Sequence, residues 1–169
     1  MKRGVGKSGQ MQLPFGMIFS IFLIAVFIVV AVIAITMFLN IQGNVETGSF
    51  LRDLQKEVDN LWVSSGGGEY VFERELNSKI SMVCFFDVNG RITGNSEIAL
   101  TFKEQTDNEG NLHNFYFYPQ RGASIPSTYI EHINLKEAVK SENPYCIGKQ
   151  NGKVKIKLEK GFEALVRVS

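Results

Sequence analysis

The most prominent hydrophobic pattern in the chain is an unbroken apolar run from residue 14 to residue 39. Its only polar side chains are Ser20 and Thr36, whose hydroxyls can bond back to carbonyls of their own helix. As a helix rising about 1.5 Å per residue, the run is longer than the roughly 30 Å hydrocarbon core of a bilayer. Because a bilayer offers the backbone no hydrogen-bond partner, the pattern predicts one transmembrane helix over residues 14–39.

The charges beside this run predict its orientation. Lys2, Arg3 and Lys7 precede it without an acidic residue, whereas acidic and basic residues are mixed after it. By the positive-inside rule, residues 1–13 form a cytoplasmic tail and the segment after the helix lies outside the cytoplasm. The run is longer than the core of a cleaved secretory signal, and no small-residue cleavage site follows it. We therefore expect a retained signal-anchor in a single-pass protein of the cell membrane.

Residues 40–49 are expected to form a linker, and residues 50–169 to form one extracytoplasmic domain. The first predicted element of this domain is a helix that Thr47-Gly48-Ser49 would cap and that continues to about Val63. Spacings of three and four place its apolar side chains on one face, which would cover a sheet or pack against copies of itself. These side chains are Phe50, Leu51, Leu54, Val58, Leu61 and Trp62.

Alternating apolar residues predict the strands of this domain. The strongest runs from Ile80 to Val88, where apolar residues on both faces favour a central strand. Asn134 resembles the cap of a capping box and would open a short helix to about Glu142. The sum is an α+β domain, with an antiparallel sheet of five to seven strands and one or two helices. The other predicted strands lie near residues 70–76, 97–103, 112–118, 145–149, 153–158 and 162–168.

Three turn signals separate these strands. Asn89-Gly90 and Asn151-Gly152 are each typical of a tight β-hairpin turn. The polar stretch from Asp107 to Asn111 predicts a further turn.

Composition and cysteine content exclude several classes of protein. With 18 basic and 17 acidic residues and a net charge of +1, the chain lacks the basic excess of a nucleic-acid-binding protein. Two cysteines are too few for a zinc ribbon. Outside the cytoplasm, Cys84 and Cys146 can form a disulfide that closes a long loop and stabilises by about 4 kcal/mol on chain-entropy grounds. The alternative is two buried free thiols.

Candidate chemistry is sparse. His113 and His132 do not have the spacing of a metal site, even with Glu131 nearby. No serine lies in a G-x-S-x-G turn, and the glycines at 66–68 lack the lysine of a phosphate-binding loop. We therefore expect no catalytic, cofactor-binding or metal-ligating residue, and no cofactor. The lysines could contact anionic headgroups, or protect a sheet edge from aggregation; they are Lys149, Lys153, Lys155, Lys157 and Lys160.

Two resemblances bear on this layout. Lys7-Ser8-Gly9-Gln10-Met11, ahead of the apolar run, resembles the leader of archaeal type IV pilin-like proteins. That resemblance implies cleavage between Gly9 and Gln10, a long apolar helix and a β-rich head. Four longer segments resemble uncharacterised single-span proteins of archaea, which implies the same layout of anchor and domain and assigns no functional residue. These segments are residues 10–20, 50–58, 83–85 and 143–146.

We therefore expect a non-enzymatic, single-pass membrane protein that presents an extracytoplasmic globular domain for assembly or interaction at the cell surface. Its expected partners are the lipid bilayer and either copies of itself or other membrane or surface proteins, and not nucleic acid. Two alternatives stay open. One is a pilin-like filament subunit cleaved after Gly9. The other is a membrane-tethered enzyme of unknown reaction, with a pocket between sheet and helix.

Overall fold

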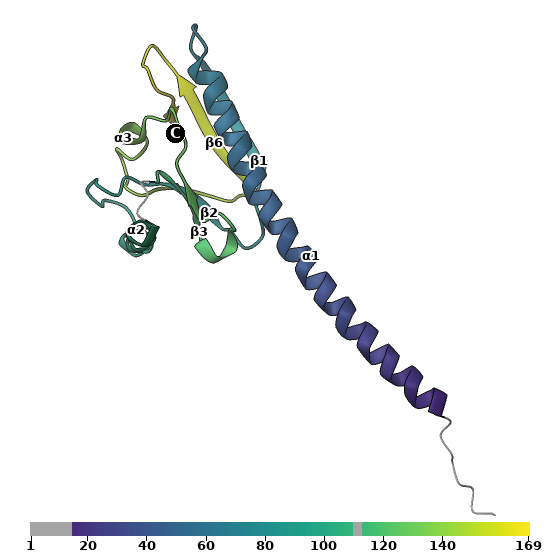
Figure 1. Cartoon of the computed structure of the whole chain (residues 1–169). Coiled ribbons are helices and arrows are strands. Elements are labelled where there is room, and N and C mark those ends of the chain that lie inside the picture. The colour runs from purple at the N-terminus through teal and green to yellow at the C-terminus, as the bar shows by residue number, and fades with distance from the viewer. Residues whose placement is uncertain (1–14, 110–112) are drawn as a thin grey trace, which may run out of the picture. The chain divides into compact units, whose positions relative to one another are not determined.

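A computed structural model describes residues 15–109 and 113–169. It divides the chain into two units, Met1–Asn40 and Ile41–Ser169, which are called unit 1 and unit 2 below. Helix α1, Phe15–Trp62, contributes residues to both units (Figure 1). The two predicted helices are therefore parts of one helix, and residues 40–49, predicted as a linker, are helical. Ser49 does not cap a new helix, because α1 is helical on both sides of it. Its hydroxyl accepts a hydrogen bond from the Arg52 side chain.

The described part of unit 1 is an apolar helix. Within the described residues, Gly16–Phe38 is the one helical segment long and apolar enough to cross a membrane, with a mean hydropathy of 3.4. None of it is buried in the protein. The Ser20 hydroxyl donates to the Gly16 carbonyl at 2.7 Å, and the Thr36 hydroxyl donates to the Ile33 carbonyl at 2.9 Å. Both hydroxyls are thus satisfied within the helix, as the sequence predicts.

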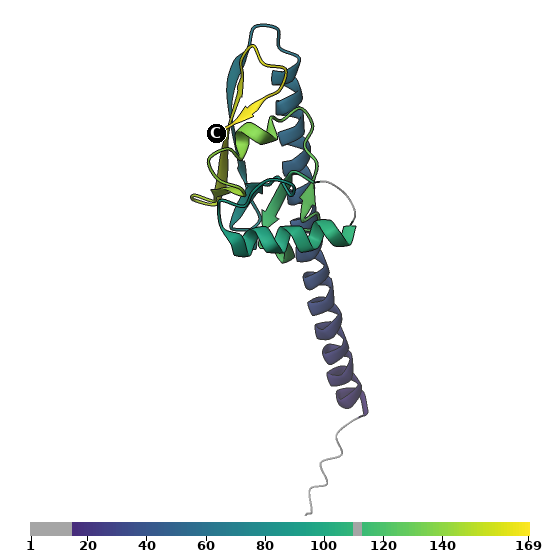
Figure 2. The ribbon, with the colours of Figure 1, turned by 90° about the vertical axis from the view of Figure 1, so that its left-hand side faces the viewer.

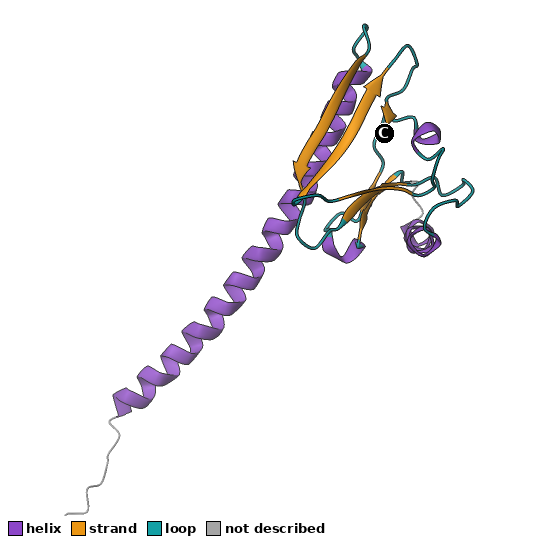
Figure 3. Ribbon diagram, turned by 180° about the vertical axis from the view of Figure 1, so that it is seen from behind, coloured by secondary structure: helices purple, strands orange, loops and turns teal. Residues whose placement is uncertain are grey.

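Within residues 41–109 and 113–169, seven strands form two antiparallel sheets, where the sequence predicts a single sheet of five to seven strands (Figure 3). Both sheets turn an apolar face to the same core, and alternation alone cannot distinguish two sheets from one. Sheet A has the order β1 (Gly68–Glu75), β6 (Lys153–Lys160), β7 (Arg167–Val168). Sheet B has the order β4 (Ser127–Thr128), β3 (Phe115–Tyr118), β2 (Met82–Phe85), β5 (Tyr145–Gly148).

The main core of unit 2 lies between the second part of α1 and the two sheets. The Phe50 ring of α1 meets Phe72 of β1 at 5.2 Å and Phe117 of β3 at 5.6 Å between centroids, both edge to face. The amphipathic face predicted for residues 50–63 packs here as far as Leu61, and Leu54 and Val58 are fully buried. Trp62, predicted on the same face, is 42% exposed. The other fully buried members include Ile80, Val83, Phe85, Phe115, Val154, Ile156, Leu158 and Val166.

Residues 97–103, predicted as a strand, lie instead in helix α2, Ser96–Glu109, which crosses the other face of sheet B (Figure 2). The side-chain oxygen of Asn95 accepts hydrogen bonds from the amides of Glu97 and Ile98, as a helix cap does. The strand prediction was wrong because Ile98 and Phe102 also fit helical spacing. Leu100, which the alternation would bury, is 57% exposed. The turn predicted from residue 107 is helical to Glu109, and the rest of it lies outside the described residues.

The remaining local signals divide into correct and incorrect ones. Asn151 and Gly152 have φ values of 50° and 80° and form the predicted tight turn before β6, closed by the bridge between Gln150 and Lys153. The hairpin predicted there is wrong, because β5 and β6 belong to different sheets. Asn134 caps α3, Leu135–Ala138, which ends sooner than predicted. Asn89-Gly90 is not a hairpin turn, because the neighbours of β2 are β3 and β5. A short 3₁₀ helix, η1 (Gln120–Gly122), follows β3.

Candidate functional site

The two cysteines occupy opposite positions on neighbouring strands of sheet B. Cys84 of β2 is paired in register with Cys146 of β5, and the structure joins them by a disulfide with their Cα atoms 4.1 Å apart. The structure therefore contains the disulfide that the sequence analysis gave as one of two alternatives. Cys84 is fully buried on the α2 face of the sheet. The bond ties the segment that contains β5 to the centre of the sheet.

Aromatic side chains of sheet B and α2 surround this disulfide. The rings of Phe102 and Tyr116 stack with centroids 4.4 Å apart, and Phe86 meets Tyr116 edge to face at 5.8 Å. The Tyr116 hydroxyl lies 2.8 Å from the Thr106 hydroxyl, so the polar end of this buried ring is paired. The α2 face of the sheet is thus a second, smaller core with a cross-link inside it.

A buried asparagine joins two loops beside the disulfide. The side-chain oxygen of Asn143 accepts from the Asp87 amide at 3.0 Å, and its amide nitrogen donates to the Asp87 and Arg91 carbonyls at 2.9 and 3.2 Å. Its backbone nitrogen donates to the Thr93 hydroxyl at 3.0 Å. The approach is close, because a side chain at Gly94 would collide with the Pro144 carbonyl oxygen at 2.8 Å. We call residues 87–94 and 140–144 the Asn143 loop pair.

The Asn143 loop pair presents polar side chains from a fixed backbone. Several of its side chains are exposed, and its backbone is held by the asparagine and by the adjoining disulfide-linked strand. Loops held on a rigid scaffold are where binding residues concentrate. The loop pair is therefore the best-defined candidate interaction surface in unit 2. Its exposed residues are Asn89, Arg91, Thr93, Lys140, Ser141 and Glu142.

A serine and a histidine meet between β4 and the segment before β3. The Ser127 hydroxyl oxygen lies 2.7 Å from Nδ1 of His113 and accepts a hydrogen bond from the Gln105 amide at 2.8 Å. A catalytic serine needs a hydroxyl that substrate can reach. Ser127 is only 5% exposed, and Gln105 of α2 occupies its other side. The arrangement joins α2 to sheet B and offers no open nucleophile.

The second histidine anchors a loop to the end of α1. The imidazole of His132 stacks on the Trp62 indole, with centroids 3.7 Å apart and an interplanar angle of 10°. Its Nδ1 lies 3.0 Å from an Asp59 carboxylate oxygen, and the Gln55 amide nitrogen donates to the same oxygen at 2.7 Å. His132 therefore has an aromatic and a carboxylate partner, both from α1, and its role is to hold the loop before α3.

The lysines of β6 are paired with glutamates across the outer face of sheet A. Lys153 and Lys155 both reach Glu73, and Lys157 reaches Glu69 and Glu159. The hydrogen bond from Lys155 lowers the pKa of the Glu73 carboxyl, and that from Lys157 lowers the pKa of Glu159. These groups are exposed or half-exposed to solvent, so their contribution to stability is small. Because β6 lies between β1 and β7, the prediction that these lysines protect a sheet edge is wrong. Their pairing with glutamates also argues against a free basic surface.

A shallow depression of about 510 Å³ lies between α3, β5 and the ends of β6 and β7. Its charged lining residues are Glu137 and Glu159 of one sign and Lys140 and Arg167 of the other. Because acidic and basic side chains both line the depression, its lining does not indicate whether a ligand would be anionic or cationic. Within residues 15–109 and 113–169, no three His, Cys, Asp or Glu side chains gather as a metal site.

The sequence located part of this architecture. It gave a Cys84–Cys146 disulfide as one of two alternatives, and the structure forms that bond. The predicted cleavage site at Gly9 and Gln10 lies outside the described residues. It missed the role of Asn143, whose only local signal is its place before Pro144 and Cys146. A buried asparagine that pairs with backbone groups 52 and 56 positions away leaves no pattern in its own neighbourhood.

Comparison with known proteins assigns neither a family nor a function to the chain. Comparison of the chain with protein-family models, with curated proteins and with solved structures finds no match.

Proposed function

We propose that the chain is a non-enzymatic membrane protein, anchored by the first part of α1, whose unit 2 lies outside the cytoplasm and serves assembly or interaction at the cell surface. The observation that carries this proposal is the combination of two features in one chain. One is an apolar helical segment, Gly16–Phe38, with no protein packed around it. The other is a domain cross-linked at Cys84 and Cys146.

Each feature supports one part of the proposal. A helix that is apolar on every side and unburied needs an apolar solvent, and a bilayer supplies one. Disulfides persist in oxidising compartments and are rare in the cytosol, so the cross-link supports an extracytoplasmic unit 2. The basic residues before α1 support the same orientation.

The polar architecture of unit 2 supports interaction over catalysis. Its buried polar side chains, such as Asn143 and Asn114, bond to backbone groups and fix loops. The serine and histidine in contact are enclosed by packing. The Asn143 loop pair presents exposed side chains of both charges from loops that hydrogen bonds hold together.

Orientation is testable with an amine reagent that does not cross membranes, applied to intact cells that express the chain. We expect Lys56 and Lys136, both exposed on unit 2, to be modified in intact cells. Lys2 and Lys7 precede the span and should react only after the membrane is permeabilised. Mass mapping of the purified chain gives the readout.

The four lysines also supply the control, since permeabilised cells should label all of them. Modification of Lys2 and Lys7, with Lys56 and Lys136 protected, would reverse the proposed topology. Recovery of the chain in the soluble fraction without detergent would contradict the anchor itself.

A second candidate function is a pilin-like filament subunit. The observation that favours it is the continuity of α1, in which an apolar segment and an amphipathic segment packed on two antiparallel sheets belong to one helix. This layout agrees with what the leader resemblance at residues 7–11 implies, a long apolar helix followed by a β-rich head.

Leader cleavage separates the two candidates. If the chain is a pilin-like subunit, its intact mass, measured on protein from its native membrane, should correspond to a chain beginning at Gln10. Gly9→Leu should then leave the leader in place, because the resemblance implies a peptidase that cuts after a glycine. The matched variant Gly6→Leu should still be cleaved. A mature chain that retains Met1 would exclude the pilin-like filament subunit. The proposal of an anchored surface protein would then remain.

A further inference from the structure

Strand β1 leaves one long edge of sheet A without a neighbouring strand. It pairs with β6 alone, in unbroken register from Gly68 to Glu75. The other strands at the edges of the two sheets are shorter, since β4 and β7 have two residues each and β5 has four. Proteins guard exposed edges with short strands, bulges or proline, and β1 has none of these. Helix α1 packs against a face of this sheet (Figure 3), and Val71, in the middle of the edge, is 51% exposed.

The hydrogen bonds of β6 show which backbone groups of β1 face this edge. The Leu76 amide donates to the Gly152 carbonyl at 3.0 Å, and bonds between two antiparallel strands involve every second residue. On the other side of β6, Lys157 exchanges two bonds with Ser169, so its neighbours in β6 are the residues that pair with β1. Both observations give the same phase. The residues of β1 whose N–H and C=O groups face outward are therefore Glu69, Val71, Glu73 and Glu75.

One side chain of the described residues already bonds to this edge. The Arg74 guanidinium donates to the Glu73 carbonyl at 3.1 Å and lies 3.4 Å from an Asp53 carboxylate oxygen of α1. The first contact agrees with an outward Glu73 carbonyl. Because the Arg74 side chain is 45% exposed, an incoming strand can displace it at small cost.

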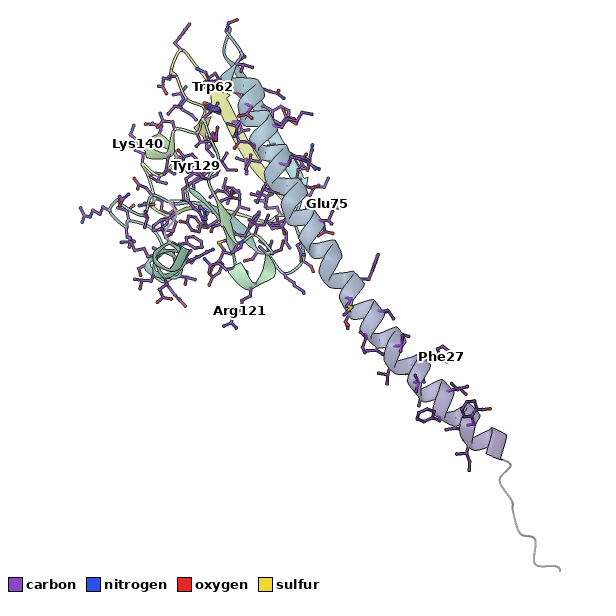
Figure 4. The ribbon with its side chains drawn as sticks, in the orientation of Figure 1. Phe27, Trp62, Glu75, Arg121, Tyr129 and Lys140 are labelled. Atoms are coloured by element: carbon purple, nitrogen blue, oxygen red, sulfur yellow. A yellow bond between two sulfur atoms is a disulfide. The ribbon has the colours of Figure 1, made fainter. Side chains whose placement is uncertain are left out.

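The side chains beside this edge indicate which kind of strand would pair there. Three glutamates and Val71 alternate on the outer face, and β6 places Lys155 opposite Glu73 and Lys153 opposite Glu75. Both lysines reach Glu73, whereas Glu75 forms no ion pair within the described residues and projects into solvent (Figure 4). The acidic row thus lies at the free edge, with the basic row behind it. A strand with lysine or arginine at alternate positions would repeat on the open side the match that β6 makes.

A second copy of the chain does not supply such a strand. Its β6 is paired on both sides, and its short edge strands β4, β5 and β7 contain no lysine. Two β1 edges paired antiparallel about Val71 would place Glu69 opposite Glu73. Paired about Phe72, they would place Glu69 opposite Glu75. Like charges directly opposite each other destabilise a sheet, so the edge fits another protein better than a copy of itself.

We propose that β1 is a strand-addition site, at which an extended segment of a partner protein, with lysine or arginine at alternate positions, joins sheet A. Backbone hydrogen bonds to the free edge provide the affinity, and the glutamates select the segment. This inference names a partner class for the proposed interaction role and rests on that part of the proposed function. The contacts that carry it all lie within unit 2.

The test adds a capped synthetic heptapeptide, Lys-Thr-Lys-Thr-Val-Thr-Lys, to the full chain in mild nonionic detergent. In antiparallel register this peptide places a lysine opposite each glutamate of the edge and its valine opposite Val71. Hydrogen exchange is followed at single amides by NMR. The four outward amides should exchange more slowly, about tenfold at a peptide concentration ten times its dissociation constant. The amides of β1 that already bond to β6 should change little.

Two control peptides separate strand addition from simple attraction between charges. N-methylation of the second lysine and of the valine removes N–H groups that face β1 and keeps every charge. This peptide should give no protection. Replacement of the three lysines by glutamate keeps the backbone groups and should raise the dissociation constant about tenfold or more, because like charges then lie opposite each other.

Substitutions in β1 test the same two contributions from the side of the protein. Val71→Pro removes one outward N–H and leaves the bonds to β6, so it should abolish the protection, whereas Val71→Thr should keep it. Slow exchange at the amides bonded to β6 reports that each variant is folded. Glu69→Lys with Glu75→Lys should raise the dissociation constant of the lysine peptide about two- to fivefold for each position. The matched control, Glu97→Lys with Glu104→Lys, makes the same change in net charge at exposed positions of α2 and should leave it unchanged.

The possible failures are distinguishable. No protection by the lysine peptide, protection without alternation along β1, or equal protection by the N-methylated peptide would each overturn the strand-addition site. None of these results bears on the membrane anchor. Recovery of the chain in the soluble fraction, or lysine labelling that reverses its topology, would contradict the proposed function whatever the peptide does.

Discussion

Removal of the Cys84–Cys146 bond should lower the free energy of unfolding of unit 2 by about 4 kcal/mol. The two residues are separated by 62 positions, and closing a loop of this length restricts the unfolded chain by about that amount on the chain-entropy account. A typical domain has only about 5–15 kcal/mol in total, so the loss is a large share of its stability. The measurement is urea unfolding of the full chain in mild detergent. Trp62, the single tryptophan, reports on unit 2 from its stack against His132.

The comparison that isolates the cross-link is between the oxidised and the reduced wild type, and the double variant Cys84→Ala, Cys146→Ala measures the packing loss in addition. Reduction opens the bond and keeps both sulfur atoms, whereas the variant also loses packing at the fully buried position 84. We expect the reduced wild type to lie between the oxidised protein and the variant. Alkylation of the native protein without reductant tests the bond directly, because two freely modified thiols would show that it does not form in the cell.

Replacement of Asn143 by alanine should destabilise unit 2 by about 2–4 kcal/mol, since buried groups that lose their partner cost about 1–3 kcal/mol each. The change removes the acceptor for the Asp87 amide and the donor for the Asp87 and Arg91 carbonyls. Unlike the loss of the disulfide, it acts on the folded state and on one loop. Amide hydrogens of residues 87–94 should therefore exchange faster even under conditions where unit 2 stays folded.

A matched substitution tests whether the burial of Asn143 causes the expected loss of stability. Asn60→Ala removes an asparagine from the exposed face of α1, where its side chain makes a long contact of 3.4 Å with Glu57. Its effect should stay within about 0.5 kcal/mol, as for ordinary surface positions. An Asn143→Ala variant with an unfolding midpoint equal to that of the wild type would show that water replaces the lost hydrogen bonds, and that the loop pair does not depend on this residue.

The part of the fold that the sequence predicted depends on short-range signals. The amphipathic face from Phe50 to Val58 is correct because helical spacing and burial coincide over several turns. The caps and turns at Asn134 and Asn151-Gly152 are correct because the chemistry of those residues acts on the nearest backbone groups. The cysteine pair was predicted as one of two alternatives, and strand register brought it together.

The errors arose where one pattern fits two structures. Ile98, Leu100 and Phe102 alternate, yet Asn95 caps a helix there and leaves Leu100 in solvent. Asn89-Gly90 has the residues of a hairpin turn, but the amide of Asn89 bonds to the Asp87 side chain and the strand pairs elsewhere. In both places a hydrogen bond from a neighbouring polar side chain determines the backbone geometry. The alternation of apolar residues does not predict such a bond.

By itself, the sequence determined the apolar segment, its flanking charges and the mixed character of the domain, because hydropathy, charge and capping act over a few neighbouring residues. Only the tertiary structure decided that seven described strands divide into two sheets, that α2 covers the disulfide and that Asn143 joins two loops. Those features depend on contacts between residues far apart in the chain, such as the 56 positions from Asp87 to Asn143. No local pattern encodes such a separation, and it is fixed when the two sheets close on a common core.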